Sequence, residues 1–225
     1  MLEALKETVC EANLELFRRG VVLYTWGNVS GIDRERGLVV IKPSGVPYQG
    51  MQPSDMVVVD LEGRIVEGTL RPSSDTPTHL ELYKAFPEIG GVVHTHSTHA
   101  VVFAQAGMEI PPLGTTHADY FYGAVTVSRS LTRDEVQEAY EKNTGRVIVE
   151  TVKETGREPL AVPGVLVRNH GPFTWGKDPA EAVYHSVVLE EIAEMAWKTL
   201  QINPAAALPP YILEKHYQRK HGSKA

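Results

Sequence analysis

Cysteine is nearly missing from this sequence of 225 residues: Cys10 is its only one, so no disulfide can form within the chain. Cys10 lies on the apolar stripe of an expected first helix, where a buried structural thiol is more common than a nucleophile. No stretch approaches the roughly 18 consecutive apolar residues of a membrane-spanning helix. The opening MLEALKETV has acidic residues among its apolar ones and lacks the apolar core of a signal peptide. We therefore expect a cytoplasmic protein without a membrane partner.

Long basic runs are also missing. The chain has 22 Lys and Arg against 28 Asp and Glu, which gives a net charge of −6. A nucleic-acid-binding protein normally carries a basic face, so we exclude that partner. Neither G-x-G-x-x-G nor G-x-x-x-x-G-K-[ST] occurs, so the fingerprints of nucleotide-binding folds are absent as well.

Helical and strand patterns alternate irregularly along the chain and include one hairpin, which argues against a fully parallel, doubly wound sheet. We predict one α/β domain over residues 1–225, with a mixed, mostly antiparallel central sheet and helices on both faces. The expected helices span residues 2–19, 76–86, 98–106, 132–142, 178–201 and 209–221. The expected strands span residues 21–24, 38–42, 56–61, 64–68, 92–96, 124–128 and 164–171.

The strongest local signal is His94-Thr95-His96 in an expected strand. Residues two apart on a strand point to the same face, so both imidazoles would reach one metal ion. Two histidines on a solvent-facing strand are the alternative, and H-x-H alone favours a metal only slightly. His170 ends the apolar run GVLV-RN and precedes Gly171-Pro172, a strand-end position typical of sites. Three histidines plus a carboxylate or water form a typical catalytic zinc site.

Asp75, in the loop PSSDTP, is the candidate carboxylate for this metal site. The same residue stands just before an expected helix, where Asp is a preferred N-cap. A lone Asp at such a position caps a helix more often than it binds a metal.

Three loops of small residues form a second signal: TWGNVS at residues 25–30, KPSG at 42–45 and PSS at 72–74. Glycine lets a ligand approach the backbone, and Ser hydroxyls with free N–H groups suit phosphate oxygens. Ser73 and Ser74 also precede a helix N-terminus, whose dipole favours an anion. Lys42 could add positive charge. Each loop alone predicts no more than a turn, so their value depends on the fold bringing them together.

Asp119, in the polar loop GTTHADY, is a candidate general acid or base. An Asp has an ordinary pKa of about 4, so acid chemistry at neutral pH would need a pKa raised by burial or by a negatively charged substrate. A hydrogen-bonded loop without a catalytic role is the alternative.

Taken together, TWGNVS, IKPSGV, PSSDTPTH, VHTHSTHA and GTTHADYFYG, with the spacing between them, resemble the class II aldolase and adducin head family over nearly the whole chain. The resemblance implies a three-layer α/β/α domain with a mostly antiparallel sheet. It also implies a cyclic homotetramer with active sites between subunits.

The resemblance further implies a role for each matching residue. His94, His96 and His170 would bind one Zn²⁺ per subunit, or another divalent ion such as Mn²⁺ or Co²⁺, with Asp75 at the same site. Asp119 would donate or accept a proton. The residues that would hold the substrate, chiefly its phosphate, are Gly27, Asn28, Ser44, Gly45, Ser73 and Ser74.

One departure from the family pattern concerns proton transfer. The family's second acid–base group is a tyrosine in the last few residues, which reaches a neighbouring subunit's site. This sequence stops at Ala225 without a matching tyrosine. We expect either a tail beyond this sequence or a different residue in that role, with His216 near the neighbouring site.

The activity that the resemblance implies is metal-dependent inversion of C4 in L-ribulose 5-phosphate to give D-xylulose 5-phosphate, in L-arabinose catabolism. Aldolase members carry Glu in place of Asp75, so Asp favours epimerisation. An aldolase acting on L-fuculose 1-phosphate or a similar sugar phosphate is the nearest alternative. A non-catalytic adducin-like interaction module is a second one, against which the complete histidine set and Asp75 argue. A cupin shares H-x-H but needs a Glu shortly afterwards, and none is evident.

Overall fold

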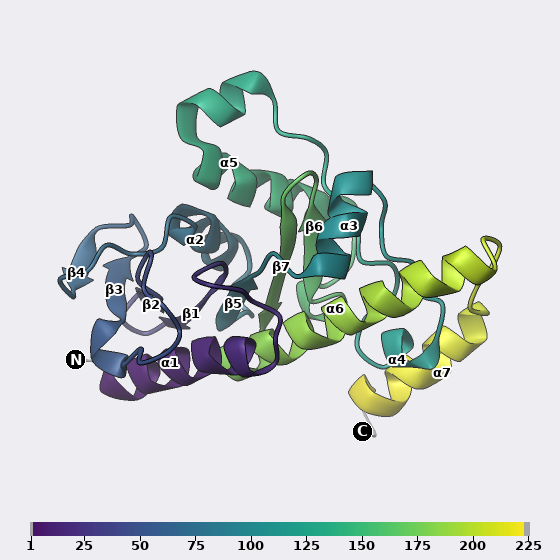
Figure 1. Cartoon of the computed structure of the whole chain (residues 1–225), viewed down its shortest axis with the longest axis horizontal. Helices are drawn as coiled ribbons and strands as arrows, with labels where there is room; N and C mark the ends of the chain where they lie inside the picture. The colour runs from purple at the N-terminus through teal and green to yellow at the C-terminus, as the bar shows by residue number, and fades with distance from the viewer. Residues whose placement is uncertain (1, 223–225) are drawn as a thin grey trace.

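The computed structural model of the chain describes residues 2–222, within which seven strands form one sheet in the order β4-β3-β2-β1-β5-β7-β6 (Figure 1). Every pair of neighbouring strands is antiparallel. The expected mostly antiparallel sheet is therefore confirmed, and an isolated bridge between Val127 and Leu166 adds a parallel contact. The strands are β1 (Asn28–Asp33), β2 (Leu38–Ile41), β3 (Val57–Asp60), β4 (Ile65–Glu67), β5 (Gly91–His94), β6 (Gly164–Val167) and β7 (Gly171–Gly176).

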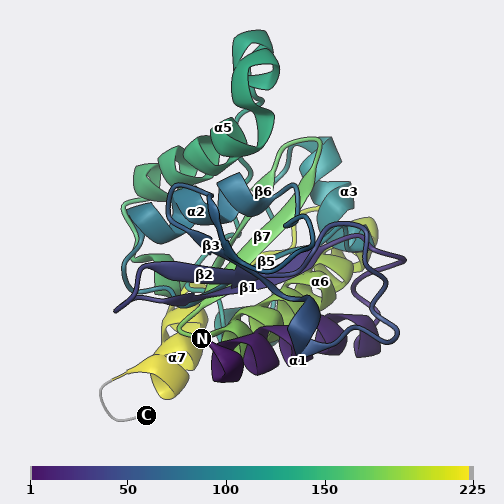
Figure 2. The ribbon, with the colours of Figure 1, turned by 90° about the vertical axis from the view of Figure 1, so that its left-hand side faces the viewer.

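Helices cover both faces of this sheet, as expected for a three-layer α/β/α architecture. Figure 2 shows α1 and α6 below the sheet and α2 and α5 above it. No helix among the described residues is long and apolar enough to span a membrane. The helices are α1 (Glu3–Arg18), α2 (Thr76–Ala85), α3 (Thr98–Ala106), α4 (Thr115–Ala118), α5 (Arg133–Glu154), α6 (Pro179–Ile202) and α7 (Pro210–His221), with short 3₁₀ turns at Pro53–Asp55 and Pro159–Ala161.

The alternation of side chains along the central strands explains why both faces need a cover. Val40, Val58 and Val93 pack in the cluster that contains the buried side of α1. Their chain neighbours, including Val39 and Val92, pack on the opposite side with residues of α2 and α5. Successive strand residues face opposite ways, so a strand that is apolar throughout is buried on both sides. Each buried Val side chain contributes roughly 1.5 kcal/mol or more.

Four expected strands differ from the structure. Residues 21–24 are irregular rather than a strand and end in a turn at Tyr24, which has a left-handed φ of 52°, and β1 begins only at Asn28. The expected strand 92–96 ends at His94. The expected strand 164–171 is two strands, β6 and β7, joined by a tight turn in which Asn169 has φ 60°. Residues 124–128 contribute isolated bridges at Val125 and Val127 rather than a named strand.

Helix α5 extends well beyond its expected end at residue 142. It begins with a capping box, in which Thr132 accepts from the Glu135 amide and the Glu135 side chain accepts from the Thr132 amide. At Ala139 the backbone is extended, with φ −162° and ψ 74°, so the element is two helices joined at a break. The part before the break projects from the rest of the chain (Figures 1 and 2).

Candidate active site

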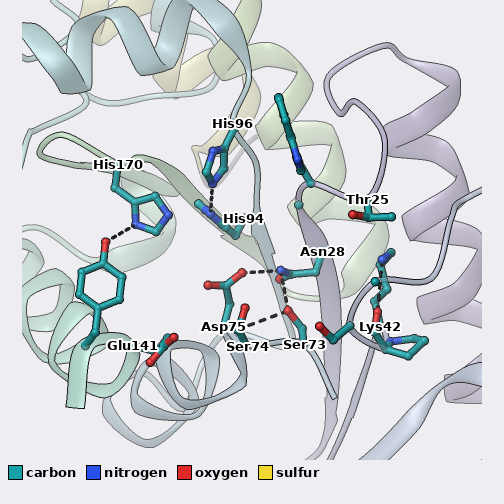
Figure 3. A pocket seen from close by; sticks show the side chains of 16 residues that line it. Thr25, Asn28, Lys42, Ser73, Ser74, Asp75, His94, His96, Glu141 and His170 are labelled. Atoms are coloured by element: carbon teal, nitrogen blue, oxygen red, sulfur yellow. Dashed lines mark hydrogen bonds between the residues drawn. The ribbon is translucent and has the colours of Figure 1, made fainter. Parts of the chain in front are cut away.

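A cavity of about 640 Å³ lies where β1 begins and β5 ends. It brings together the three small-residue loops and the histidines, although they come from distant parts of the sequence (Figure 3). The expected site residues that line it are Gly27, Asn28, Ser44, Gly45, Ser73, Ser74, Asp75, His94, His96 and His170. The remaining lining residues are Thr25, Trp26, Lys42, Pro43, Tyr140 and Glu141.

The three histidines present a ready-made ligand set for a metal ion. One ring nitrogen from each of His94, His96 and His170 lies within 4.8 Å of the other two. The Nε2 atoms of His94 and His96 are 3.0 Å apart. Two nitrogens bound to one tetrahedral Zn²⁺ at about 2.0–2.1 Å each would be separated by roughly 3.3 Å. Small movements would therefore seat an ion here, and the residues fit the metal that the sequence predicts.

His94 is the most firmly held of the three. It is the last residue of β5, it is buried, and its ring stacks on Phe173 at 4.2 Å. Its Nδ1 donates to the carbonyl of Pro172 at 3.0 Å, which leaves the Nε2 lone pair for a ligand. His96 lies two residues beyond the end of β5, in a segment without regular secondary structure. The expected convergence of the two imidazoles is nevertheless observed.

His170 reaches the same point from the turn between β6 and β7. Burial, with the neighbouring His94 and His96, lowers the pKa of His170 to about 3. Burial is also the main cause that lowers the pKa of His96. Both rings are therefore neutral at physiological pH, which is the form that binds a metal.

Asp75 points into the same cavity, although it lies outside the group formed by the three histidine nitrogens. It stands at the N-cap position of α2, but its side chain makes no capping hydrogen bond. Its Oδ2 accepts from Asn28 Nδ2 at 2.7 Å. Burial alone would raise the pKa of Asp75, but interactions with His94 and His79 and the bond from Asn28 outweigh it, so the pKa is below its usual value. An ionised carboxylate thus stands beside the histidines.

Asn28 connects the histidines to the serine loops. It pairs with His94 across β1 and β5, and its Nδ2 also donates to Ser73 Oγ at 3.0 Å. Its Oδ1 is buried and has no partner within the described chain. A buried acceptor without a donor is costly, so this oxygen is suited to accept from a ligand hydroxyl. Gly27 is required beside it because a Cβ there would lie 2.8 Å from the His94 carbonyl oxygen.

Backbone hydrogen bonds join the serine loops to each other. The amide of Ser73 donates to the Lys42 carbonyl at 3.0 Å, and that of Ser44 donates to the Arg71 carbonyl at 2.8 Å. These two amides are therefore not free to bind a phosphate, although the sequence suggested that N–H groups of the serine loops would do so. The Ser73 hydroxyl accepts from Asn28 and from the Asp75 amide, so its own proton remains to be donated.

Lys42 supplies the positive charge in this part of the cavity. Its side chain is buried, its Nζ donates to the Pro43 carbonyl at 3.2 Å, and it lies 5.0 Å from the centre of the Tyr48 ring. Burial lowers the pKa of Lys42 to about 8. A bound anion would favour the charged form and raise this pKa again.

Asp119 does not line the cavity. It follows α4 and is held by α7, where His216 Nδ1 and Arg219 Nη2 each donate to its Oδ1 at 3.0 Å. Burial would raise the pKa of Asp119, but the hydrogen bonds from His216 and Arg219 outweigh it and lower the pKa. The raised pKa that acid chemistry would need is absent here, and Asp119 is ionised, which is the form that can accept a proton.

Tyr140 and Glu141 were not expected in the site. The sequence places them near the end of a plain helix, where such residues are usually solvated. The only signal nearby is Asn143-Thr144-Gly145, three poor helix formers that follow directly. The break in α5 lies earlier, at Ala139, and Tyr140 and Glu141 line the cavity directly after it.

Comparison with known proteins gives consistent results. Residues 7–197 match the family described as Class II Aldolase and Adducin N-terminal domain. The chain is 59% identical over 225 residues to L-ribulose-5-phosphate 4-epimerase UlaF of Salmonella paratyphi B, covering 100% of this chain and 98% of the relative. Among solved structures it is similar to an L-fuculose 1-phosphate aldolase, with a TM-score of 0.80, 25% identity and coverage of 96% and 95% of the two chains. An L-fuculose-1-phosphate aldolase from Thermus thermophilus is similar at a TM-score of 0.68 and 26% identity, over 91% of this chain and 98% of the other.

Proposed function

The chain belongs to the class II aldolase and adducin N-terminal domain family, and we propose from this premise that it is a metal-dependent L-ribulose-5-phosphate 4-epimerase. The observation that carries the proposal is the cavity itself, in a chain 59% identical to a protein of that name. It places the imidazoles of His94, His96 and His170 and an ionised Asp75 next to loops suited to a phosphate.

The reaction explains why such a cavity is needed. C4 of a 2-ketopentose 5-phosphate is not adjacent to the ketone, so its hydrogen is not acidic. Cleavage of the C3–C4 bond avoids this difficulty, because the electron pair left on C3 is delocalised into the neighbouring carbonyl. Re-addition of that carbon to the other face of the aldehyde fragment inverts C4.

We propose that His94, His96 and His170 hold the ion, with Asp75 beside them, and that the ion is Zn²⁺. Mn²⁺ and Co²⁺ suit the same mixed imidazole and carboxylate donors. A bound divalent ion supplies Lewis acidity that stabilises the negative charge developing on the keto fragment.

The serine loops would hold the aldehyde fragment by its phosphate while it turns. Ser44, Gly45, Ser73 and Ser74 line the side of the cavity where Lys42 is buried. The unpartnered Asn28 Oδ1 would accept from a sugar hydroxyl between phosphate and metal. Retaining the fragment is what distinguishes an epimerase from an aldolase, which releases it.

Proton transfer at the C4 hydroxyl is assigned to Asp119. Its place directly after α4, away from the cavity of its own chain, fits this role when a second copy presents Asp119 to the cavity of the first. We therefore propose a homotetramer of single-domain subunits, each comprising residues 1–225. A cytoplasmic location suits a protein whose single cysteine is buried and unpaired.

The decisive experiment is conversion of L-ribulose 5-phosphate to D-xylulose 5-phosphate, followed before and after chelation and after zinc is restored. We expect conversion to disappear with the chelator and to return with zinc. Full activity in a protein shown to be metal-free would contradict the metal-dependent mechanism.

An aldolase is the second candidate, because the fold is similar to L-fuculose 1-phosphate aldolase at a TM-score of 0.80. Release of dihydroxyacetone phosphate from L-fuculose 1-phosphate, with no epimerisation of L-ribulose 5-phosphate, would favour it. The opposite result would favour the epimerase.

A further inference from the structure

The break in α5 is built from specific side chains. The carbonyl of Glu135, four residues before the break, accepts from the side chain of Asn143, four residues after it, with Nδ2 at 2.9 Å. This hydrogen bond joins the helix before the break to the helix after it.

The chain just after the break is fixed to α2. Thr78 Oγ1 donates to the Glu141 carbonyl at 2.6 Å, and Thr144 Oγ1 donates to the Tyr140 carbonyl at 2.8 Å. Gly145 lets the two helices approach, since a Cβ there would lie 3.0 Å from the Thr78 carbonyl oxygen. Two side-chain hydrogen bonds therefore hold the backbone of Tyr140 and Glu141 in one place.

The consequence is a contact between Tyr140 and a candidate metal ligand. The Tyr140 hydroxyl lies 3.4 Å from His170 Nδ1. In Figure 3 a dashed line leaves this nitrogen of His170, and the second ring nitrogen points toward His94 and His96. The contact therefore engages the nitrogen of His170 that faces away from the metal site.

His170 depends on such a partner more than His94 does. His94 lies on a central strand and is fixed by the Pro172 carbonyl, whereas His170 lies in a turn directly after Asn169 with φ 60°. A histidine that binds a metal almost always donates its other N–H to an acceptor, which fixes both the tautomer and the ring orientation.

We propose that Tyr140 is a positioning residue for His170: its hydroxyl oxygen accepts from Nδ1–H and keeps Nε2 directed at the metal site. The proposal rests on the metal-dependent function above. The break at Ala139 is the device that brings the hydroxyl there, because it lets the chain leave the first half of α5 and start again at the cavity wall.

The test is Tyr140→Phe, which removes the oxygen and keeps the ring. The affinity for Zn²⁺ is measured by competition with a chromophoric chelator, and the visible absorption spectrum of the Co²⁺-loaded protein reports the ligand field. We expect roughly 10-fold weaker Zn²⁺ binding and an altered cobalt spectrum. The thermal midpoint of the metal-free protein should be unchanged, since no packing is lost. Tyr211→Phe is the matched control, because Tyr211 is 74% exposed and lies on α7.

Unchanged zinc affinity and an unchanged cobalt spectrum in Tyr140→Phe would overturn the positioning role, even if turnover falls. A wild-type protein that binds no more Zn²⁺ than His96→Asn would overturn this role and the proposed function together. A wild-type protein that binds Zn²⁺ but converts no L-ribulose 5-phosphate would overturn the function alone, and weaker binding by Tyr140→Phe would still support the positioning role.

Discussion

Two polar regions of the molecule, the cavity and the cluster of Asp119 with His216 and Arg219, differ in where their residues come from and in how their polar groups are paired. The cavity gathers residues from β1, β5, the β6–β7 turn and three loops, and it pairs them through short hydrogen bonds such as Asn28 to Asp75. The Asp119 cluster forms between α4 and α7, where Asp119 already has His216 and Arg219 as partners. In the cavity, the buried Asn28 Oδ1 has no hydrogen-bond partner among the described residues, whereas the Asp119 carboxylate is already paired within the chain.

This difference in location separates two tasks of the proposed reaction, ligand binding and proton transfer. Binding of metal and phosphate depends on atoms that one chain places together by itself. Proton transfer depends on a group that the same chain holds elsewhere. The predictions below test this separation, beginning with the largest expected effect.

His96→Asn should abolish turnover and metal retention together, because it removes one of three clustered ligand nitrogens. Metal content after dialysis and epimerase activity are measured on the same sample. His185→Asn is a useful comparison, since His185 is buried but bonds to the Trp175 carbonyl instead. A His96→Asn protein that keeps its metal would show that the three histidines are not the ligand set.

Asp119→Asn should lower kcat by about 10²- to 10⁴-fold, the usual contribution of a general base, while zinc affinity stays the same. Kinetics and chelator competition are measured in parallel. Mixing unfolded Asp119→Asn with unfolded His96→Asn and refolding them together should restore part of the activity, because a site between two copies can then hold both wild-type groups. No restoration would place both groups in one chain's site.

Ser73→Ala should raise KM without loss of metal. A hydrogen bond to a charged group contributes about 1.5–3 kcal/mol, so kcat/KM should fall at least roughly 10-fold. The exposed Ser54, in the 3₁₀ turn Pro53–Asp55, provides the control variant Ser54→Ala. An equal effect of both substitutions would argue against a phosphate contact by Ser73.

The pH dependence of KM should report Lys42. With a pKa of about 8, Lys42 is charged below this pH and neutral above it. KM for the sugar phosphate should therefore rise by a small factor as pH increases through 8, and the rise should move to higher pH in Lys42→Arg. A KM that is flat to pH 10 in the wild type would remove Lys42 from phosphate binding.

Much of the fold follows from local pattern. The apolar run at residues 38–41 forms strand β2, as its composition predicts. The expected hairpin is also present, with β3 and β4 on either side of the turn residues Glu62-Gly63. Residues 21–24 are similarly apolar but form an irregular connection between α1 and β1, which the composition alone does not distinguish from a strand. β7 was not predicted as a separate strand because it begins with Gly171-Pro172, and a Pro argues against a strand in the middle of a sheet.

The site was predictable where its residues carry their chemistry in the sequence. The histidines, Asp75 and the serine loops do so, and the structure places them around one cavity. Tyr140 could not be found that way, since its position depends on the break that Asn143 and Thr78 stabilise. The lowered pKa of Asp119 depends on α7, nearly 100 residues later in the chain.

The unequal anchoring of the three histidines has a kinetic consequence. His94 belongs to a strand at the centre of the sheet, while His96 lies in the irregular segment after that strand and His170 in the turn between β6 and β7. A bound ion could then leave by stepwise detachment from His96 and His170, without disruption of the sheet. We expect exchange of the metal to be much faster than global unfolding, so that a cell could replace one divalent ion by another within the lifetime of a single folded molecule.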